Sequence, residues 1–255
     1  MAKHGHPLGI DVGGSGIKGA PVDLKKGVLT RKRLRIDTPQ PSTPHAVIEV
    51  VAAIVAEFAG ETGRSPIGVT VPAVVTHGIV RSAANIDHGW IDFDAQGALR
   101  ERIGRDVTVV NDADAAGVCE LHYGAAKDED GLVILTTLGT GIGSALLWNN
   151  QLVPNSELGH LEVDGRDAEK DAASSVKDAL GLTYEEYAKR LQRYYSVLES
   201  LFSPDLFVVG GGISKDADQF LPLLSLRAPI VAAALRNGAG IIGAARLAVE
   251  AATAR

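Results

Sequence analysis

Apolar residues near the start of the chain fall into short runs that glycine-bearing turns separate. Runs at residues 8–12, 17–22 and 28–36 predict three strands of an antiparallel meander. Two shorter runs, at residues 67–71 and 107–110, predict buried strands of a mostly parallel sheet. The pattern therefore indicates an α/β protein in which a meander leads into parallel strands.

Helical periodicity is clearest in three segments. The first begins at Thr43, an N-cap that a proline follows, and is expected to stop at Gly60. The second opens with the capping-box pair Thr183 and Glu186, and an alanine-rich stretch at residues 238–252 predicts a C-terminal helix. The apolar residues expected to face the core are Val47, Val51, Ile54, Val55 and Phe58 in the first helix and Tyr187, Leu191, Tyr194, Leu198 and Leu201 in the second.

The second half of the chain begins the same plan again. An apolar strand at residues 132–138 runs into a glycine turn, and another strand follows. The four residues GTGI from Gly139 repeat the GSGI that begins at Gly14, at a distance close to half the chain. Two strand–turn–strand units in similar contexts indicate two similar halves. A further strand at residues 206–209 runs into a third glycine cluster.

The turn after Asp11 predicts a phosphate site. The string GIDVGGSGIK at residues 9–18 joins a strand-ending carboxylate, clustered glycines and Lys18. Such glycines let backbone N–H groups wrap an anion, and a carboxylate can hold a divalent cation. The glycines also fit the dinucleotide fingerprint, but a strand follows them instead of a helix, and the P-loop pattern is absent. Alone, the turn also fits an ordinary hairpin; its repeat at Gly139 favours a pair of phosphate loops.

Composition and charge exclude several classes of protein. The chain has 255 residues, enough for one large domain or two small ones, and a net charge of −6 argues against a general nucleic-acid binder. The single cysteine, Cys119, excludes a disulfide framework and a multi-cysteine zinc site. No apolar run has membrane-spanning length and the N-terminus lacks a signal-peptide core, so a cytoplasmic protein without a membrane partner is expected.

Four cations in the run 28–36 allow two interpretations. They could form a strip that binds a polyanion, or they could protect an exposed edge strand from aggregation. We favour the second interpretation, because charged residues commonly guard edge strands. The four residues are Arg31, Lys32, Arg33 and Arg35.

Polar residues at strand ends are the candidates for chemistry. Asp112 follows a buried strand, where α/β sheets present their active groups, and Asn111 is expected to cap the next helix. With two phosphate loops inferred, Asp112 becomes the candidate base for an attacking hydroxyl group. Asn85, Glu157 and His160 would suit a sugar, whose hydroxyl groups need both donors and acceptors. The acidic stretch Glu162, Asp164, Asp167 and Glu169 is expected to be a solvated face.

Five motifs occur in the order typical of ROK-family sugar kinases and span essentially the whole chain. They are DVGGSGIK from Asp11, ND from Asn111, LGTGIG from Leu138, ELGH from Glu157 and GGGI from Gly210. The resemblance implies an actin-like, ribonuclease-H-like fold with duplicated βββαβα halves and two lobes that flank a cleft. Residues 1–112, together with a helix at about 238–255, would form the small lobe. Residues 113–237 would form the large lobe. Two copies of the chain would form a homodimer.

Carried over to this sequence, the resemblance assigns three sets of residues. Asp112 would be the base that activates the 6-hydroxyl group of a hexose. The sugar would be held by Asn85, Asn111, Asp112, Glu157, His160 and Glu169. The phosphoryl donor would be held by Asp11, Gly13, Gly14, Ser15, Gly16, Lys18, Thr137, Gly139, Thr140, Gly141, Gly211 and Gly212. Asp11 would also lie near the Mg²⁺ ion of the donor and bind it through water.

One departure from the family pattern indicates a particular branch of the family. ROK kinases commonly follow the Gly-His pair with a cysteine cluster that binds zinc and ends in a sugar-contacting glutamate. The corresponding stretch here, from Leu161 to Glu169, has no cysteine. No structural zinc is therefore expected, and Glu169 stands in for that glutamate. This pattern resembles the polyphosphate glucokinase branch, whose members phosphorylate glucose, and in some cases mannose, with inorganic polyphosphate and often also ATP.

Three alternatives remain beside that function. The first is a strictly ATP-dependent ROK hexokinase that acts on another hexose. The second is a sugar-sensing ROK regulator, which would need a DNA-binding segment ahead of the first glycine turn, where only eight to ten residues are present. The third is an actin-like or chaperone-type ATPase, which would have no use for the sugar set. The cations Lys18, Arg31, Arg33, Arg166 and Lys215 are candidates for polyphosphate contacts, but the sequence does not show how they cluster.

Overall fold

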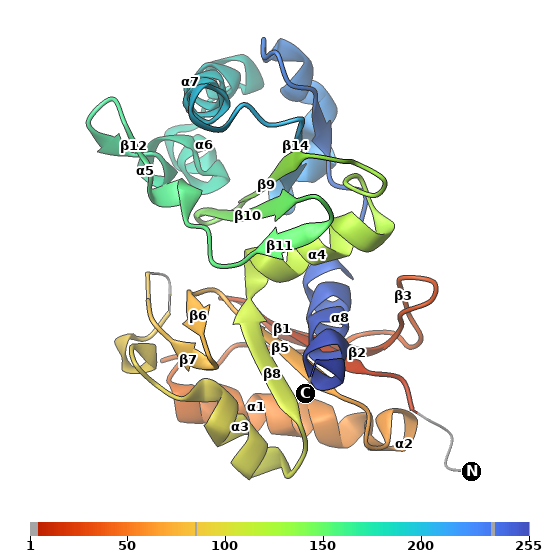
Figure 1. Ribbon diagram of the computed structural model, residues 1–255. Coiled ribbons are helices and arrows are strands. Elements are labelled where there is room, and N and C mark those ends of the chain that lie inside the picture. The colour runs from red at the N-terminus through yellow and green to blue at the C-terminus, as the bar shows by residue number, and fades with distance from the viewer. Residues whose placement is uncertain (1–4, 85, 236–237, 255) are drawn as a thin grey trace. The chain divides into compact units, whose positions relative to one another are not determined.

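The computed structural model describes residues 5–84, 86–235 and 238–254 and divides them into two compact units (Figure 1). Unit 1 holds the described residues up to Cys119 and those from Gly238 onward, and unit 2 holds the described residues between them. The chain passes from unit 1 to unit 2 inside a helix, between Cys119 and Glu120. Each helix in the described ranges is too short or too polar to span a membrane.

Unit 1 contains a mixed sheet in which β1 lies between an antiparallel and a parallel neighbour. Its strands are β1 (Leu8–Val12), β2 (Ile17–Asp23), β3 (Val28–Leu29), β4 (Leu34–Ile36), β5 (Ile67–Val71) and β8 (Val107–Asn111), beside the hairpin of β6 (Val75–Thr76) and β7 (Ile79–Val80). Its helices are α1 (Pro44–Glu57), α2 (Ala59–Thr62), the 3-10 helix η1 (His88–Trp90), α3 (Ala95–Ile103), α8 (Ala239–Thr253) and the start of α4 (Asp112–Tyr123). The main strand order is β3-β2-β1-β5-β8, and β4 also pairs with β2.

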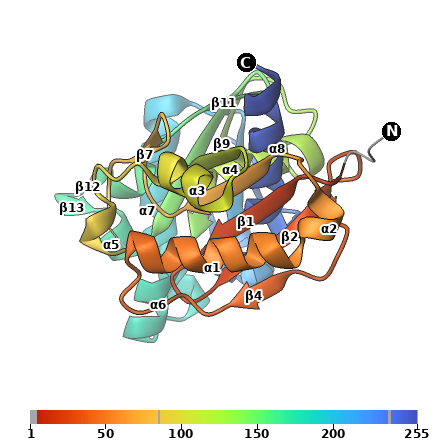
Figure 2. The same ribbon diagram turned by 90° about the horizontal axis from the view of Figure 1, so that it is seen from below.

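Helices cover both faces of this sheet. Helices α1 and α3 pack on one face, where the apolar core of the unit lies, and α8 crosses the other (Figure 2). Gly9 of β1 and Gly68 of β5 are directly paired beneath α8. A Cβ atom on either would lie within 2.0 Å of a carbonyl oxygen of Ile241 or Ala244, so the close packing of α8 requires both glycines.

Two sequence predictions for unit 1 are wrong in detail. The run 28–36 is not one strand: β3 and β4 pair with different parts of β2, because Thr30 turns back and its amide donates to the carbonyl oxygen of Pro21. The first helix ends at Glu57, before Gly60, because Phe58 leaves helical geometry and a short helix, α2, follows. The predicted N-cap of α1, Thr43, is confirmed, since its hydroxyl oxygen accepts a hydrogen bond from the amide of Ala46.

Unit 2 repeats the sheet order of unit 1. Its strands are β9 (Leu132–Leu138), β10 (Ile142–Trp148), β11 (Gln151–Val153), β14 (Leu206–Gly210) and β15 (Ile230–Ala232), beside the hairpin of β12 (Glu162–Val163) and β13 (Arg166–Asp167). Its helices are α5 (Glu169–Ala172), α6 (Ser174–Leu180), α7 (Tyr184–Phe202) and the 3-10 helices η2 (Leu158–His160), η3 (Gly212–Gln219) and η4 (Leu221–Leu223). The order β11-β10-β9-β14-β15 has the same antiparallel and parallel neighbours as β3-β2-β1-β5-β8.

The duplicated α/β halves predicted from the sequence are therefore confirmed, with one difference. Where unit 1 places helix α3 between its last two strands, unit 2 has only the 3-10 helices η3 and η4. The capping box of α7 is present, and its core face is buried as predicted except at one residue. Leu201 is 60% exposed, whereas the next residue, Phe202, packs against the core of unit 2.

Candidate functional site

The first glycine loop, residues 13–16, joins β1 to β2 and is closed by its own backbone. The amide of Gly13 donates to the carbonyl oxygen of Gly16 at 3.2 Å. From outside the loop, the hydroxyl group of Thr38 donates to the carbonyl oxygen of Gly13 at 2.5 Å. The carboxylate of Asp11 accepts a bond from the Thr70 hydroxyl group at 3.0 Å. The loop and the acid at its base are thus fixed from two sides.

The second glycine loop, residues 139–141, is closed in the same way in unit 2. The amide of Gly139 donates to the carbonyl oxygen of Gly141 at 2.9 Å. This loop is one residue shorter than the first, because the last strand pair is Leu138 with Ile142 here but Val12 with Ile17 in unit 1. By strand register, the position of Asp11 in unit 1 is therefore taken by Thr137 in unit 2, which has no carboxylate.

Residues far along the chain hold the second loop in place. Glu169 accepts a bond from the amide of Ile142 at 2.8 Å, and the hydroxyl groups of Ser174 and Ser175 donate to carbonyl oxygens of the loop at 3.0 and 2.7 Å. On another side, Gly211 has a φ of +82°, and a Cβ atom there would meet the backbone of Leu138 at 2.3 Å. The third glycine cluster of the sequence therefore lies against the second loop.

Asn111 and Asp112 stand where β8 ends and α4 begins. The Asn111 side chain is buried, and its Oδ1 accepts bonds from the amides of Ala113 and Asp114 at 2.8 and 3.0 Å. Its Nδ2 donates to the carbonyl oxygen of Ala73 at 3.1 Å, which leaves one amide N–H for a ligand. The expected N-cap is confirmed. Asp112 is half-buried in the first turn of α4.

Unit 2 brings three of the predicted sugar residues together, and their charges act on one another. Burial raises the pKa of Glu157; the nearby charge of His160 lowers it, and that of Glu169 raises it. The pKa of His160 is also raised, chiefly by its hydrogen bond to Asp167. The loop that carries Glu157 is fixed by Ser144, whose hydroxyl group donates to the carbonyl oxygen of Ser156 at 2.8 Å and accepts from the amide of Leu158.

The acidic stretch 162–169 is a solvated face only in part: Glu162 and Asp164 are exposed, as the sequence predicts, whereas Asp167 and Glu169 are half-buried. Asp167 lies 3.0 Å from the Nδ1 atom of His160 and also accepts a bond from the amide of Glu169. Asp164 forms a two-pronged ion pair with Arg193, with distances of 2.7 and 2.6 Å. The prediction fails for Asp167 and Glu169 because the fold brings them against His160 and the amide of Ile142.

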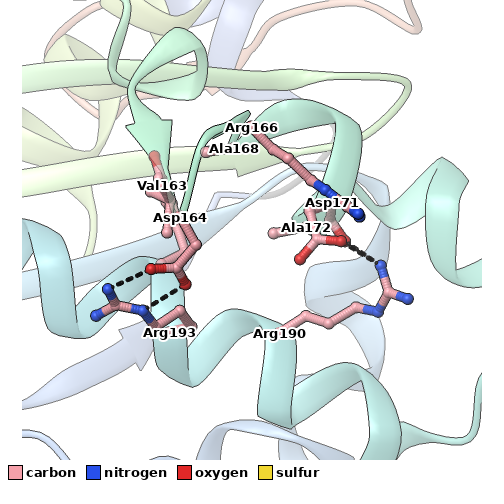
Figure 3. Close-up of a pocket in the computed structure, with 9 residues that line it drawn as sticks. Val163, Asp164, Arg166, Ala168, Asp171, Ala172, Arg190 and Arg193 are labelled. Carbon is pink, nitrogen blue, oxygen red and sulfur yellow. Dashed lines mark hydrogen bonds and ion pairs between the residues drawn. The ribbon is translucent and has the colours of Figure 1, made fainter.

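A cavity of about 310 Å³ separates this hairpin from helices α5 and α7. Figure 3 shows the Asp164–Arg193 pair at one side of the cavity and the Asp171–Arg190 pair at the other. Arg166, a candidate for polyphosphate contacts, also lines this cavity. The two ion pairs connect the hairpin and α5 to α7, so they support the segment that carries Asp167 and Glu169.

The residues predicted from the sequence to bind the sugar or the phosphoryl donor are distributed over both units. Unit 1 contains Asp11, Gly13, Gly14, Ser15, Gly16, Lys18, Asn111 and Asp112, and unit 2 contains Thr137, Gly139, Thr140, Gly141, Glu157, His160, Glu169, Gly211 and Gly212. Asn85 lies outside the described residues. Arg31 forms an ion pair with Glu61, and Lys215 lies 4.0 Å from Asp216. In the part of the chain that the structure describes, no three His, Cys, Asp or Glu residues form a cluster able to hold a metal ion.

Sequence reasoning missed the residues that hold the candidates in place. Thr70, Ser144 and Asp167 each bond to a candidate residue or to the loop that carries it. Ser174 and Ser175, which donate to the second glycine loop, were missed in the same way. The sequence offered no signal for these roles, because each partner is brought close by the fold and not by spacing along the chain.

Comparison with known proteins agrees with the fold and the motif order. The ROK family model matches residues 7–175. The chain is 53% identical to a polyphosphate glucokinase of Mycobacterium tuberculosis, over 96% of this chain and 91% of that protein. The chain therefore belongs to the ROK family, and its fold class is the actin-like α/β fold of ROK sugar kinases.

Two solved structures show the similarity in three dimensions. The inorganic polyphosphate/ATP-glucomannokinase from Arthrobacter sp. strain KM has a TM-score of 0.92 and 54% identity, and the match covers 98% of this chain and 100% of that one. A ROK family glucokinase from Streptomyces griseus, in complex with glucose and AMPPNP, has a TM-score of 0.83 and 26% identity, with 96% and 100% covered.

Proposed function

We propose that this protein is a glucokinase that transfers a phosphoryl group from inorganic polyphosphate or ATP to the 6-hydroxyl group of glucose. The observation that carries the proposal is the repeated strand–loop–strand unit, with each glycine loop closed by a hydrogen bond of its own. It occurs in a chain that is 53% identical to a polyphosphate glucokinase over almost its whole length. This identity also favours an enzyme over a sugar-sensing regulator.

Asp112 is proposed as the general base. It follows a buried parallel strand, and phosphoryl transfer needs a group that accepts the proton of the attacking hydroxyl group. Asn111 would orient it, since the cap that Asn111 forms fixes the first turn of α4. The proton of the sugar hydroxyl group would pass to a carboxylate oxygen of Asp112 as the new bond to phosphorus forms and the bond to the leaving phosphate breaks.

The sugar would be held by Asn85, Asn111, Glu157, His160 and Glu169. Glu157 supplies carboxylate acceptors, and His160 presents Nε2 because Nδ1 faces Asp167. One oxygen of Glu169 is already bound by the amide of Ile142, so it would contact the sugar through the other. Fixed donors and acceptors of this kind place the 6-hydroxyl group in line with the donor, which is the main requirement of phosphoryl transfer.

The donor would lie on the glycine loops, whose backbone N–H groups are suited to phosphate oxygens. Asp11 fits a Mg²⁺ ion, because this ion usually keeps several waters and is bound through one or two carboxylates and the phosphates of the substrate. Oδ1 of Asp11 is held by Thr70, which leaves Oδ2 for a magnesium-bound water. When bound, the ion would neutralise charge on the donor, and Lys18 would add to that effect.

The proposal is tested by coupled assays of glucose 6-phosphate and mannose 6-phosphate formation. Purified protein is compared with polyphosphate and with ATP as donor, and with glucose and with mannose as acceptor. We expect product with glucose from both donors. Absence of activity with either donor would overturn the kinase assignment, and activity with ATP alone would remove polyphosphate. Activity only with a hexose other than glucose would support the ATP-dependent hexokinase alternative.

Three finer features are also part of the proposal. Mannose is a second acceptor, which the 54% identity to a glucomannokinase supports. The protein works in the cytoplasm, which the buried thiol of its single cysteine, Cys119, supports. It forms a homodimer, which family resemblance supports. Light scattering of the purified protein tests the last feature, since a monomeric mass at assay concentrations would contradict it.

A further inference from the structure

Strand pairing in unit 1 arranges four polar residues in one row. Asp11 is paired directly with Thr70 on β5 and with Lys18 on β2, and Lys18 is paired with Arg35 on β4. Directly paired residues project from the same face of a sheet. The row therefore runs from the buried Thr70 through the half-buried Asp11 and Lys18 to the exposed Arg35.

The charged end of this row lies against the first glycine loop. The Nη2 atom of Arg35 donates to the carbonyl oxygen of Ser15 at 2.8 Å. A Cβ atom on Gly16 would lie 2.7 Å from the Nε atom of Arg35, so the guanidinium group rests on the glycine itself. The cations that the sequence indicated as guards of an edge strand thus include one that contacts the candidate donor loop.

Both cations are available to an anion. Within the described ranges, the ammonium group of Lys18 has no hydrogen bond and no ion pair, although the residue is half-buried. The three N–H donors of this ammonium group can therefore all serve a bound anion. Arg35 pairs with Asp37 at 2.5 Å, but the Asp37 side chain is 83% exposed, so solvent screens that pair and a multivalent anion can compete with it.

We propose that Lys18 and Arg35 form a subsite for a linear polyphosphate chain, which leaves the first glycine loop along this row and reaches solvent at β4. The inference rests on the proposed function. Neighbouring strands are about 4.8 Å apart, so the row extends about 10 Å from Asp11 to Arg35. In ATP, an uncharged ribose follows the third phosphoryl group. A cation at the outer end of the row therefore contributes more to the binding of a longer polyanion than to the binding of a nucleotide.

The test compares the wild-type protein with Arg35→Gln, Arg35→Lys and Arg31→Gln. Arg31, a candidate for polyphosphate contacts in the sequence, is the matched control: it carries the same charge just before β4, but its ion-pair partner is Glu61, whereas Arg35 contacts the first glycine loop. The KM is measured for long-chain polyphosphate, tripolyphosphate and ATP. Binding of labelled long-chain polyphosphate is measured separately by fluorescence anisotropy without glucose, and thermal melting checks that each variant folds.

We expect Arg35→Gln to weaken long-chain binding and raise the long-chain KM about tenfold, the scale of one charge-assisted hydrogen bond. The KM for ATP should stay close to the wild-type value, Arg35→Lys should restore most of the loss, and Arg31→Gln should behave as wild type. An equal loss with ATP and polyphosphate would show that Arg35 only braces the loop and would overturn the subsite. Wild-type protein that uses ATP but neither binds nor uses polyphosphate would instead overturn the proposed donor, and the subsite with it.

Discussion

The Nδ1 atom of His160 lies 3.0 Å from the Oδ2 atom of Asp167, and the other oxygen of Asp167 accepts a bond from the amide of Glu169. Glu169 in turn binds the amide of Ile142, at the end of the second glycine loop. One short chain of hydrogen bonds therefore joins two proposed sugar ligands to a proposed donor loop. The geometry of the loop and that of the sugar ligands are expected to depend on each other.

Asp167→Asn should lower the pKa of His160. The hydrogen bond and the charge of Asp167 raise that pKa, the charges of Glu169 and Glu157 raise it further, and burial opposes them. Replacement by an amide removes the largest contribution but leaves Glu157 and Glu169 in place. NMR titration of the imidazole signals, with His160→Gln for assignment, measures the shift. An unchanged pKa would contradict the role given to Asp167.

The same variant should bind glucose less well than wild type. Without the carboxylate, the imidazole ring loses its fixed orientation, so the KM for glucose should rise about tenfold, while kcat falls less. Because the pKa of His160 is raised in the wild type, its protonated form persists to higher pH than in the variant, and any pH dependence of the glucose KM should move to lower pH in Asp167→Asn. Asp164→Asn is the matched control, since it makes the same change in the exposed pair with Arg193, and its KM should be near that of wild type.

Gly141→Ala should disrupt the second loop, whereas Gly139→Ala should not. A Cβ atom on Gly141 would lie 2.0 Å from Oε2 of Glu169, but a Cβ atom on Gly139 would meet nothing within 4 Å. To avoid the clash, the Glu169 carboxylate must leave the amide of Ile142, and an unpaired amide typically costs about 1–3 kcal/mol, so the catalytic efficiency of Gly141→Ala should fall about tenfold. Steady-state kinetics with each donor compares the two variants. Equal effects would show that the contact with Glu169 is not what makes Gly141 necessary.

The sequence was sufficient for the features that depend on local pattern. The glycine loops follow from small residues placed between apolar strands, and the Asn111 cap follows from an amide side chain before a helix. The repeat of GSGI by GTGI predicted two halves with the same sheet order. These features were predictable because each is set by residues within a few positions of one another.

Contacts between distant segments could not be predicted in the same way. Asp167 looks solvated in sequence because its contact with His160 depends on how the chain folds into the hairpin β12–β13, whereas Asp164 is exposed, as expected, and pairs with Arg193 of α7. Arg35 looked like a guard of an edge strand because its contact with Ser15 depends on the register between β2 and β4. Leu201 fits the helical period, but Phe202 packs against the core in its place, and the period does not choose between these two neighbours.

Asp112→Asn should keep the fold and sugar binding but lose most turnover. The amide keeps nearly the same shape, and its oxygen can still accept from the amide of Ala113, as the carboxylate does at 2.8 Å. It cannot accept the hydroxyl proton, and general bases typically contribute about 10²–10⁴-fold to the rate. Calorimetry with glucose checks binding, and the coupled assay checks kcat. Near-normal kcat would contradict the assignment of the base.

Glu120→Gln should destabilise the protein through its backbone partners. The side chain is fully buried, and its carboxylate accepts bonds from the amides of Ala125, Ala234 and Leu235 at 2.7, 3.0 and 2.8 Å. The carboxylate thereby ties the segment after α4 to the segment after β15. A glutamine places an N–H group where a carboxylate oxygen accepted, so at least one amide loses its partner.

The unfolding free energy should therefore fall by about 1–3 kcal/mol, the usual cost of a buried unsatisfied group. For a chain of this size, that loss lowers the Tm by about 2–4 °C per kcal/mol. Thermal denaturation followed by circular dichroism measures the change. Glu101→Gln, the same substitution at an exposed position, is the control and should leave the Tm unchanged. If the two variants have the same Tm, the prediction is wrong: the three amides then find other partners, and Glu120 does not hold the two segments together.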